Sequence, residues 1–396
     1  MADGTRHAVV VGAGLAGAAV SSELARHGWH ITLMDASSGP ARGASGLPVG
    51  MLSPHVTRAP TPLSRLSKLG MADTLAELKR LVPEGHGWQA CEVDNLNHDA
   101  GRWPAALVRP AALVNAWMQE AQACSSLTCL WDHPVTALQP YRWPNGSSGW
   151  EVQARAGQLA VKAAVVVVCA AVGSLRLLSA ASAAITDNAF PLRPVKGQLS
   201  FGPLSGGPLA DRPQRDSGVF VPCYEDAGLD AARMRRIWSM GSTYTRGDNS
   251  THVTADDHQR NLDSLSQFNP AAAAALKTAL AQGQVEGWAQ VRCASLDRLP
   301  LVGALPDLAA LGTAVRNQPA RRSRLKLQDV PRLPGLFTVC ALGSRGITLA
   351  HWCAKMLVRR IEHQAIDAEG DLLEAIDPAR FAWRDSRRQQ PSAICS

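Results

Sequence analysis

The sequence lacks any uncharged apolar run of the ~18 residues that a membrane-spanning helix needs, and it shows neither an internal repeat nor a long low-complexity tract. An apolar fraction of 46% with 18% charged residues is typical of a water-soluble globular protein. The apolar stretch near the N-terminus is followed by Glu23 and Asp35 rather than by a small-residue cleavage site. We therefore expect no membrane partner and take the cytoplasm as the default location.

The nine cysteines form no repeated close pairs, which argues against a disulfide framework and against a CxxC zinc site. Cys124 and Cys129 come closest to a pair, but the residues between them look like ordinary surface and core. The eleven histidines show no metal-ligand spacing. We predict reduced cysteines and no metal site. A formal net charge of +7 permits a polyanionic partner without requiring one.

The order of the predicted elements indicates an α/β protein, α+β overall. A strand over 7–11, a glycine turn over 12–17, a helix over 18–27 and a strand over 30–34 form a βαβ opening. The run 163–170 is nearly all valine and alanine, and a strand apolar on both faces belongs in the buried centre of a parallel sheet. Near the C-terminus, a strand over 336–341, a glycine turn and a helix over 347–361 repeat the same order.

The opening turn, VVVGAGLAG over 9–17, has the spacing of a dinucleotide-binding fingerprint. Gly12 permits the tight turn, Gly14 lets a pyrophosphate approach the backbone, and Gly17 lets the helix pack closely on the sheet. The helix N-terminus then faces the phosphate charge. Asp35 ends the second strand at the distance expected for an acid that binds ribose hydroxyls. The predicted contacts in this Rossmann-like unit are Gly12, Gly14, Leu15, Ala16, Gly17, Asp35 and Ala36.

Two further loops favour FAD over NAD as the cofactor. ARGASGLPVGMLSP, over 41–54, is a loop of small residues suited to lie against an extended cofactor, with Arg42 available for a phosphate. ALGSRGITLA, over 341–350, is a second glycine turn before a helix, whose backbone N–H groups suit the flavin's pyrimidine edge or phosphates. From these loops and the strands between them we predict FAD contacts at Arg42, Gly43, Ala44, Ser45, Gly46, Val135, Ala170, Gly343, Ser344, Arg345, Gly346, Ile347 and Thr348.

The chain is long enough for two or three domains at roughly 150 residues each. Between Pro191 and Gly287 it becomes a series of short strands punctuated by proline and glycine, followed by an alanine-rich helix, which indicates a second, mixed-sheet domain. We predict a discontinuous FAD-binding domain over 1–84, 105–190 and 291–375. The substrate domain is predicted over 85–104 and 191–290, and a C-terminal tail over 376–396.

Several longer motifs are much more specific than the fingerprint. They are GASGLPVGMLSP (43–54), PLRPVKGQLS (191–200), GSTYTRGDNSTHVTADDHQRNL (241–262), VRCASLDRLPLVG (291–303), LPGLFTVCALGSRGITLA (333–350) and DPARF (377–381). With them the chain resembles, over nearly its whole length, the glycine oxidase and D-amino-acid oxidase (DAO) family of flavoenzymes. Within that family it is most similar to the FAD-dependent C-terminal domains of bifunctional tRNA 5-methylaminomethyl-2-thiouridine biosynthesis proteins.

The resemblance implies an activity on the wobble uridine of tRNA. The carboxymethyl group of 5-carboxymethylaminomethyl(-2-thio)uridine is removed: the flavin accepts a hydride from the carbon between amine and carboxylate, and water hydrolyses the imine to glyoxylate and aminomethyluridine. The protein then chiefly binds and orients the substrate. The predicted substrate is tRNA. A separate methyltransferase is a candidate partner, because the methyltransferase domain that precedes this one in the bifunctional proteins is absent from the sequence.

Two arginines are the predicted catalytic residues. Arg292, in QVRCAS, matches by position the arginine that holds the substrate carboxylate in this family, a task that suits a bidentate guanidinium. The alternative for Arg292 is a surface ion pair. Arg345 lies where the flavin loop approaches the ring and is suited to stabilise negative charge on the reduced flavin. The alternative for Arg345 is a helix-capping surface residue. For Lys196, in RPVKGQ, we expect a structural role.

The sequence departs from the family pattern at three positions. Leu47 and Val49 replace polar residues in the flavin-side loop, and His351 stands where proline is usual. These departures leave two alternatives open: a small-molecule amine oxidase for glycine, sarcosine or a D-amino acid, and a flavin-holding tRNA-binding partner without turnover. The basic segments and the DDHQ motif favour the tRNA-modifying enzyme.

A tRNA substrate requires basic surface, and three segments are candidates for it. The segment 316–332 is the clearest, and the alternative for it is a solvated loop. Tryptophans are candidates for stacking on a base, although most are expected in the core. The residues concerned are Arg321, Arg322, Arg324, Lys326, Arg233, Arg235, Arg236, Arg384, Arg387, Arg388, Trp88, Trp103 and Trp238.

Overall fold

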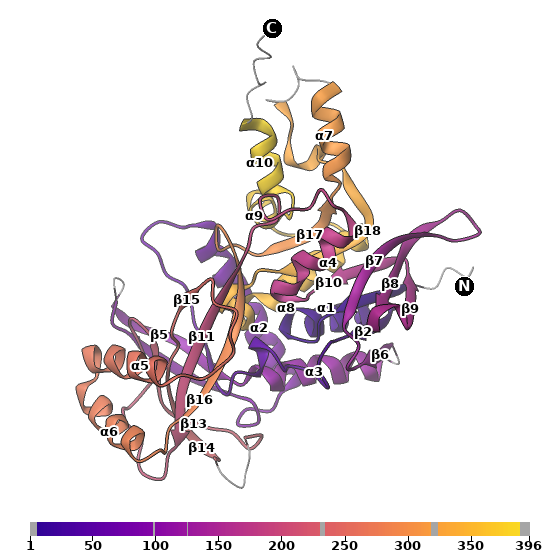
Figure 1. Ribbon diagram of the computed structural model, residues 1–396. Helices are drawn as coiled ribbons and strands as arrows, with labels where there is room; N and C mark the ends of the chain where they lie inside the picture. Colours follow the sequence, from indigo (N-terminus) through magenta and orange to yellow (C-terminus); the bar gives the residue numbers. More distant parts are fainter. Residues whose placement is uncertain (1–5, 98–99, 125, 230–233, 318–323, 389–396) are drawn as a thin grey trace.

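The computed structural model describes residues 6–97, 100–124, 126–229, 234–317 and 324–388. Within these ranges the chain forms a six-stranded, a nine-stranded and a three-stranded sheet with helices packed on them (Figure 1). This mixed arrangement confirms the α/β fold class with a mixed second sheet. Among the helices described, none combines the length and the apolar character that a bilayer crossing needs.

The six-stranded sheet contains both predicted glycine turns at the ends of its strands. Its order is β17-β18-β10-β1-β2-β6, parallel from β18 to β6 with β17 antiparallel at the edge. The run of valines in β10 is fully buried between β1 and β18, as its sequence predicts. The strands are β17 (Leu301–Pro306), β18 (Arg332–Cys340), β10 (Val165–Val168), β1 (His7–Val11), β2 (His30–Met34) and β6 (Leu127–Leu130).

Four helices share the apolar core on one face of this sheet: α1 (Leu15–Arg26), α2 (Pro62–Leu81), α3 (Pro110–Ala123) and α8 (Gly346–Ile361). The opposite face packs against the three-stranded sheet and α4. Those elements are β7 (Val135–Arg142), β8 (Ser148–Ala154), β9 (Leu159–Ala163) and α4 (Ser174–Ala181). Helix α1 begins at Leu15, inside the glycine fingerprint and earlier than the predicted start at residue 18.

The nine-stranded sheet follows the order β15-β11-β14-β13-β12-β4-β5-β3, with β16 paired along β11. Helices α5 (Ala255–Phe268) and α6 (Pro270–Ala281) cover part of it, lower left in Figure 1. Trp88 and Trp238 are buried in the core. The strands are β15 (Thr245–Arg246), β11 (Leu192–Pro203), β14 (Arg236–Gly241), β13 (Val219–Glu225), β12 (Gln214–Arg215), β4 (Trp88–Asn95), β5 (Gly101–Val108), β3 (Gly50–Leu52) and β16 (Glu286–Ser295).

Lys196 has the structural role expected for it. Its side chain is 4% exposed, and its Nζ lies 3.1 Å from a carboxylate oxygen of Asp257 at the start of α5. The pair joins β11 to that helix. Three more helices, α7 (Leu308–Asn317), α9 (Gly370–Ile376) and α10 (Arg380–Arg388), stand together at the top of Figure 1.

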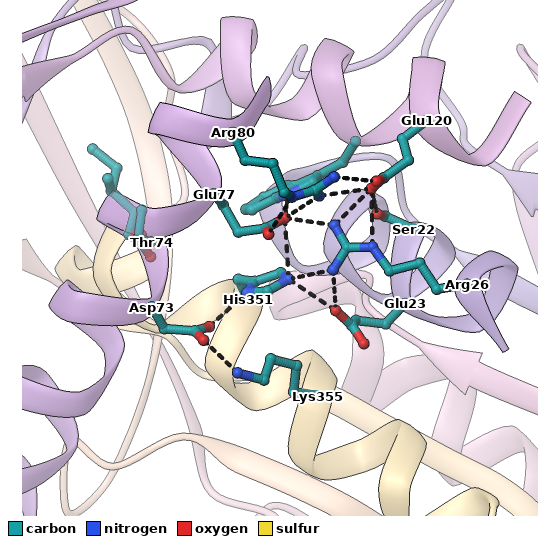
Figure 2. A network of polar contacts seen from close by, with 12 residues as sticks. Ser22, Glu23, Arg26, Asp73, Thr74, Glu77, Arg80, Glu120, His351 and Lys355 are labelled. Carbon is teal, nitrogen blue, oxygen red and sulfur yellow. Dashed lines mark hydrogen bonds and ion pairs between the residues drawn. The ribbon is translucent and has the colours of Figure 1, made fainter. Parts of the chain in front are cut away.

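A buried network of charged side chains joins α1, α2, α3 and α8 (Figure 2). At its centre is His351, which is 2% exposed. Its Nδ1 lies 2.5 Å from Asp73, and its Nε2 lies 2.9 Å from Glu23 and 3.3 Å from Glu77. Its ring stacks on Trp117 with the centroids 5.6 Å apart. His351, a departure from the family pattern, is therefore a core residue with an acidic environment.

The charges of this network balance when His351 is protonated. Four carboxylates face three permanent cations, so the imidazolium supplies the fourth positive charge. Burial opposes protonation, but the hydrogen bonds to Asp73 and Glu23 and the negative charge of Asp73 and Glu77 raise the pKa of His351 above 6.5. The members are Glu23, Asp73, Glu77, Glu120, Arg26, Arg80 and Lys355.

We predict that His351→Asn destabilises the protein by about 3–5 kcal/mol, since it leaves buried carboxylates without their cation. Because the folded-state pKa of His351 is raised, its contribution to the free energy of unfolding is complete below the unfolded value of 6.5 and is lost as the pH rises through the folded value. Urea unfolding between about pH 6 and 9 measures this loss in the wild type and its absence in the variant. His363→Asn, at an exposed position just after α8, is the control. Equal pH dependence in His351→Asn and wild type would contradict the assignment.

Candidate active site

One large cavity of about 730 Å³ opens where the six-stranded and nine-stranded sheets meet. Residues at the ends of β1, β2, β10 and β18 line one side, and residues of β11, β13, β14 and β16 line the other. The N-termini of α1 and α8 both open onto it. Its size lies in the range of about 300–1,000 Å³ that is typical of ligand and cofactor pockets.

The first glycine turn brings the backbone of α1 to the cavity. Gly12 has a φ of 109°, and a Cβ there would lie 2.5 Å from the carbonyl oxygen of Cys169. A Cβ at Gly17 would lie 1.7 Å from the carbonyl oxygen of Gly12. The spacing of these glycines is thus imposed by the tight turn and by the close approach of helix to strand.

The start of α1 has no capping side chain of its own. Its N-cap is Gly14, and the hydroxyl of Ser45 accepts a hydrogen bond from the Leu15 N–H at 3.0 Å. A Cβ at Gly14 would lie 2.9 Å from that hydroxyl oxygen and would fill the gap between helix and loop. The free N–H groups and the positive end of the helix dipole fit an anionic group there, such as a dinucleotide's pyrophosphate.

Asp35 holds the first turn closed at the end of β2. Its Oδ2 accepts a hydrogen bond from the Ala13 N–H and its Oδ1 one from the Ser37 N–H, both at 2.7 Å. The residue also lines the cavity. Each carboxylate oxygen keeps a further lone pair, so the geometry leaves room for hydroxyl donors of a ribose.

The second glycine turn lies directly beside the first. A short 3₁₀ turn, Gly343–Arg345, leads into α8, whose N-terminus also has no side-chain cap. A Cβ at Gly346 would lie 3.2 Å from Leu15 Cδ1 in the first turn of α1. Two helix N-termini whose N-cap residues supply no capping side chain therefore face one cavity, an arrangement that fits an extended, anionic cofactor.

Most of the predicted site residues line this one cavity. Those at its wall are Gly12, Gly14, Leu15, Ala16, Asp35, Ala36, Arg42, Gly43, Ala44, Ser45, Val135, Ala170, Arg292, Gly343, Ser344, Gly346 and Ile347. Gly17, Gly46, Arg345 and Thr348 are not part of the wall. Gly17 serves the packing of α1, and Thr348 is buried inside α8. The departures Leu47 and Val49 also line the cavity.

Arg292 extends from β16 and is largely buried. One Nη donates to the Ser242 hydroxyl at 3.0 Å, and the other donates to the Thr243 carbonyl at 2.7 Å. The buried Nε has no hydrogen-bond partner in the described part of the chain. No ion pair with a described carboxylate involves Arg292, so the surface ion pair considered from the sequence does not match this geometry. Burial lowers the pKa of this arginine.

Gly197 makes the position of Arg292 possible. Strand β11 pairs with β16, and a Cβ at Gly197 would lie 2.0 Å from an Nη of Arg292. The ring of Tyr244 lies over the guanidinium, with 5.1 Å between its centroid and the arginine Cζ. Sequence reasoning did not single out Gly197, Ser242 or Tyr244, although the motifs PVKGQ and GSTY contained the signal.

Arg345 lies next to the cavity and does not cap α8 with its side chain. Burial and the like charge of Arg298 and Arg215 lower its pKa. Arg215, Trp288 and Gln290 line the cavity and were also not predicted. Their positions depend on the pairing of strands far apart in the sequence, so no local motif marks them.

Comparison with known proteins agrees with this architecture. The family described as "FAD dependent oxidoreductase" (DAO) matches residues 7–104 and 89–360. Two curated relatives are named tRNA 5-methylaminomethyl-2-thiouridine biosynthesis bifunctional protein MnmC. The one from Paracidovorax citrulli is 32% identical, over 96% of this chain and 61% of its own length. The one from Ralstonia nicotianae is 30% identical, over 98% and 62%. The chain thus spans about three-fifths of the length of these relatives.

Solved structures share the fold at lower identity. Glycine oxidase from Geobacillus kaustophilus superposes with a TM-score of 0.66 at 18% identity, covering 95% of this chain and 99% of that one. Iminodiacetate oxidase from Chelativorans gives 0.64 at 17% identity, covering 94% and 98%. The family match extends over both sheets and both glycine turns. The chain therefore belongs to the DAO family of FAD-dependent oxidoreductases, and FAD is its cofactor.

Proposed function

We propose that this protein oxidises a secondary amine and removes the carboxymethyl group of 5-carboxymethylaminomethyl(-2-thio)uridine in tRNA. The observation that carries the proposal is Arg292, a largely buried cation in the cavity wall that pairs with no carboxylate among the described residues. Burying an arginine without a counter-ion costs free energy, and an anionic ligand bound to the guanidinium offsets that cost. A glycine-like carboxylate supplies that anion and fits the fork of the guanidinium.

The chemistry balances with one cofactor and one water. FAD, when bound, supplies the acceptor for the hydride that leaves the methylene carbon between amine and carboxylate. The resulting C=N bond takes up water and breaks into glyoxylate and the primary amine. The residues of the chain bind and orient: Arg292 holds the carboxylate, and Ser242 and Thr243 hold the guanidinium.

Arginines in and beside the cavity favour the reactive, uncharged form of the substrate amine. A secondary amine must be uncharged to lose a hydride from the neighbouring carbon. Arg292 and Arg215 line the cavity and Arg345 lies beside it. Their positive charge disfavours an ammonium ion and so lowers the pKa of a bound amine. No dedicated base is required.

We further propose that the two sheets divide the work. The six-stranded sheet, with residues Gly12, Asp35, Ser45 and Gly343 as the main contacts, binds FAD within the predicted segments 1–84, 105–190 and 291–375. The nine-stranded sheet, mainly from 85–104 and 191–290, supplies the substrate side through Gly197 and Ser242. Arg345, close to the second glycine turn, is placed to stabilise negative charge near the cofactor's pyrimidine edge.

The choice of tRNA over a free amine rests on the names of the curated relatives and on basic surface. Arg324 and Lys326 are exposed, and their segment packs against α10, where Trp383 donates to the Leu325 carbonyl at 2.8 Å. Residues 324–332 of that segment and helix α10, which carries Arg384, therefore lie in one region, at the top of Figure 1. Arg321, Arg322 and Arg233 lie outside the described residues. A small-molecule amine oxidase is the second candidate, favoured by the fold shared with iminodiacetate oxidase.

We predict that carboxymethylaminomethyl tRNA reduces the FAD of the purified holoenzyme under anaerobic conditions at least ~10-fold more efficiently than glycine or sarcosine. Rapid mixing with each substrate, followed by the bleaching of the visible flavin band, measures kred/Kd. Faster reduction by free amino acids would establish the small-molecule oxidase instead. Tight tRNA binding without any reduction would support a binding partner that lacks turnover.

We predict that Arg292→Gln weakens binding of the carboxylate substrate by about 10–100-fold, because a charge-assisted contact is worth about 1.5–3 kcal/mol. Arg292→Lys keeps the charge without the bidentate fork and should be intermediate. The substrate dependence of anaerobic flavin reduction gives the affinity, and the flavin spectrum reports whether FAD is still bound. Unchanged affinity in Arg292→Gln would show that the carboxylate binds elsewhere.

We predict that Gly197→Ala also weakens binding of the carboxylate substrate, although it leaves the charge of Arg292 unchanged. The added Cβ would lie 2.0 Å from the arginine Nη, so the guanidinium must move. We expect weaker substrate binding and unchanged FAD content, measured by the same assay. Gly206→Ala is the control, because a Cβ there meets no atom within 4 Å. Wild-type affinity in Gly197→Ala would mean that the observed position of Arg292 is not needed for binding.

A further inference from the structure

Three arginines from separate segments lie in the wall of the active-site cavity or in turns next to it. Arg215 lies on β12 and in the cavity wall, and Arg345 ends the second glycine turn. Arg298 is exposed, with a φ of 63°, in the turn after β16. The charges of Arg298 and Arg215 both act on Arg345 and, with burial, lower its pKa. His55 follows Pro54, whose carbonyl accepts a hydrogen bond from Arg215 at 3.1 Å. Burial and the positive charge of Arg345 and Arg215 lower the pKa of His55. We name Arg215, Arg298 and Arg345 the arginine cluster.

The arginine cluster has no neutralising carboxylate among the described residues. In the part of the chain that the structure describes, Arg215 donates to neutral groups, namely the Asn95 side chain at 3.0 Å, the Ser53 hydroxyl at 2.8 Å and the Pro54 carbonyl at 3.1 Å. The acid next to Arg298 in sequence, Asp297, is instead paired with buried Arg380 at 2.7 Å. Like charges held together without a counter-ion are unfavourable, so a bound anion would stabilise the cluster.

The segments that carry the cluster are held in place by contacts of their own. Ala294, at the end of β16, forms a bridge with Leu342, which places the turn of Arg298 alongside the flavin turn of Arg345. The Asp297–Arg380 pair fixes that turn from the other side. The hydrogen bonds of Arg215 to Asn95 and Ser53 fix its guanidinium. The guanidinium of Arg215 and the turns that carry Arg298 and Arg345 are therefore held in place by contacts within the chain.

Tyr244 is an exposed aromatic residue at the carboxylate site. Its side chain is 44% exposed, and its ring lies over Arg292. Arg292 and Arg215 line the same cavity. An aromatic ring over the carboxylate-binding arginine, at a cavity that also contains Arg215, fits a base whose ribose phosphates extend toward the arginine cluster.

Building on the proposed function, we infer that Arg215 and Arg298 of the arginine cluster bind a phosphodiester group of the substrate nucleotide while Arg292 binds its carboxylate. Arg345 adds positive charge beside them and keeps its proposed role near the cofactor. Arginine recognises phosphate through paired N–H donors, and a cation cluster adds charge attraction. The site selects a nucleotide that carries a glycine-like substituent over a free amino acid, which has no group to offer the cluster. FAD is the other source of phosphate in this protein, and the experiment separates the two.

The test compares 5-carboxymethylaminomethyluridine with its 3′,5′-bisphosphate as reductants of the holoenzyme under anaerobic conditions. We expect the bisphosphate to bind about 10-fold more tightly than the nucleoside, as one charge-assisted contact predicts. Arg298→Asn, chosen because asparagine tolerates a positive φ, should remove this advantage and leave the nucleoside's affinity and reduction rate unchanged. Arg298→Lys should retain most of the advantage. Arg142→Asn, an exposed arginine on β7, is the control.

Equal affinity for nucleoside and bisphosphate would overturn the inference, and so would a bisphosphate advantage that survives in Arg298→Asn. A loss of FAD affinity in that variant would also overturn it, because it would assign the cluster to the cofactor's phosphates. Binding of uridine 3′,5′-bisphosphate, followed by calorimetry, requires no turnover. Arg298-dependent binding of this compound without flavin reduction by either substrate would leave the phosphate site standing and reject the proposed function. Flavin reduction by the nucleoside, with equal affinity for its bisphosphate, would support the proposed function and reject the phosphate site.

Discussion

The contact between the N-termini of α1 and α8 is the constraint on which the rest of the site depends. Each helix follows a glycine turn and each begins without a side-chain cap, so both present free N–H groups and a positive dipole end to one cavity. The buried network around His351 fastens the two helices together behind this point (Figure 2). Buried charges favour one arrangement of their partners over others, so the network fixes the relative position of the two turns. In the proposed function, FAD binds across the two turns held in that position.

The substrate side is built by different means, from strand pairing rather than from helix ends. Strand β16 carries Arg292 across from β11, where Gly197 leaves the space that the guanidinium needs. Ser242 and Thr243 then hold it. The helix ends and this arginine face the same cavity from two sheets. In the proposed function, the docking of one sheet on the other therefore positions the reacting carbon between the cofactor and the carboxylate site. Positioning of this kind is the main contribution a protein makes to a flavin reaction.

The sequence predicted the parts of the site that local geometry dictates. The spacing of Gly12 and Gly17 follows from a tight turn and a close helix–strand contact, and the apolar run of β10 follows from burial on both faces. Arg292 could be named only through the resemblance to a family. The His351 network and the arginine cluster could not be predicted, because their members are spread over distant helices and turns and meet only through tertiary packing.

The central claim is oxidative removal of a carboxymethyl group from a tRNA nucleoside, and product analysis tests it most directly. The FAD-loaded protein is incubated with tRNA bearing 5-carboxymethylaminomethyluridine, the tRNA is digested to nucleosides, and these are identified by mass spectrometry while glyoxylate is assayed in the supernatant. The account predicts aminomethyluridine and glyoxylate in equal amounts. Unchanged tRNA from a protein that oxidises glycine or sarcosine under the same conditions would contradict it.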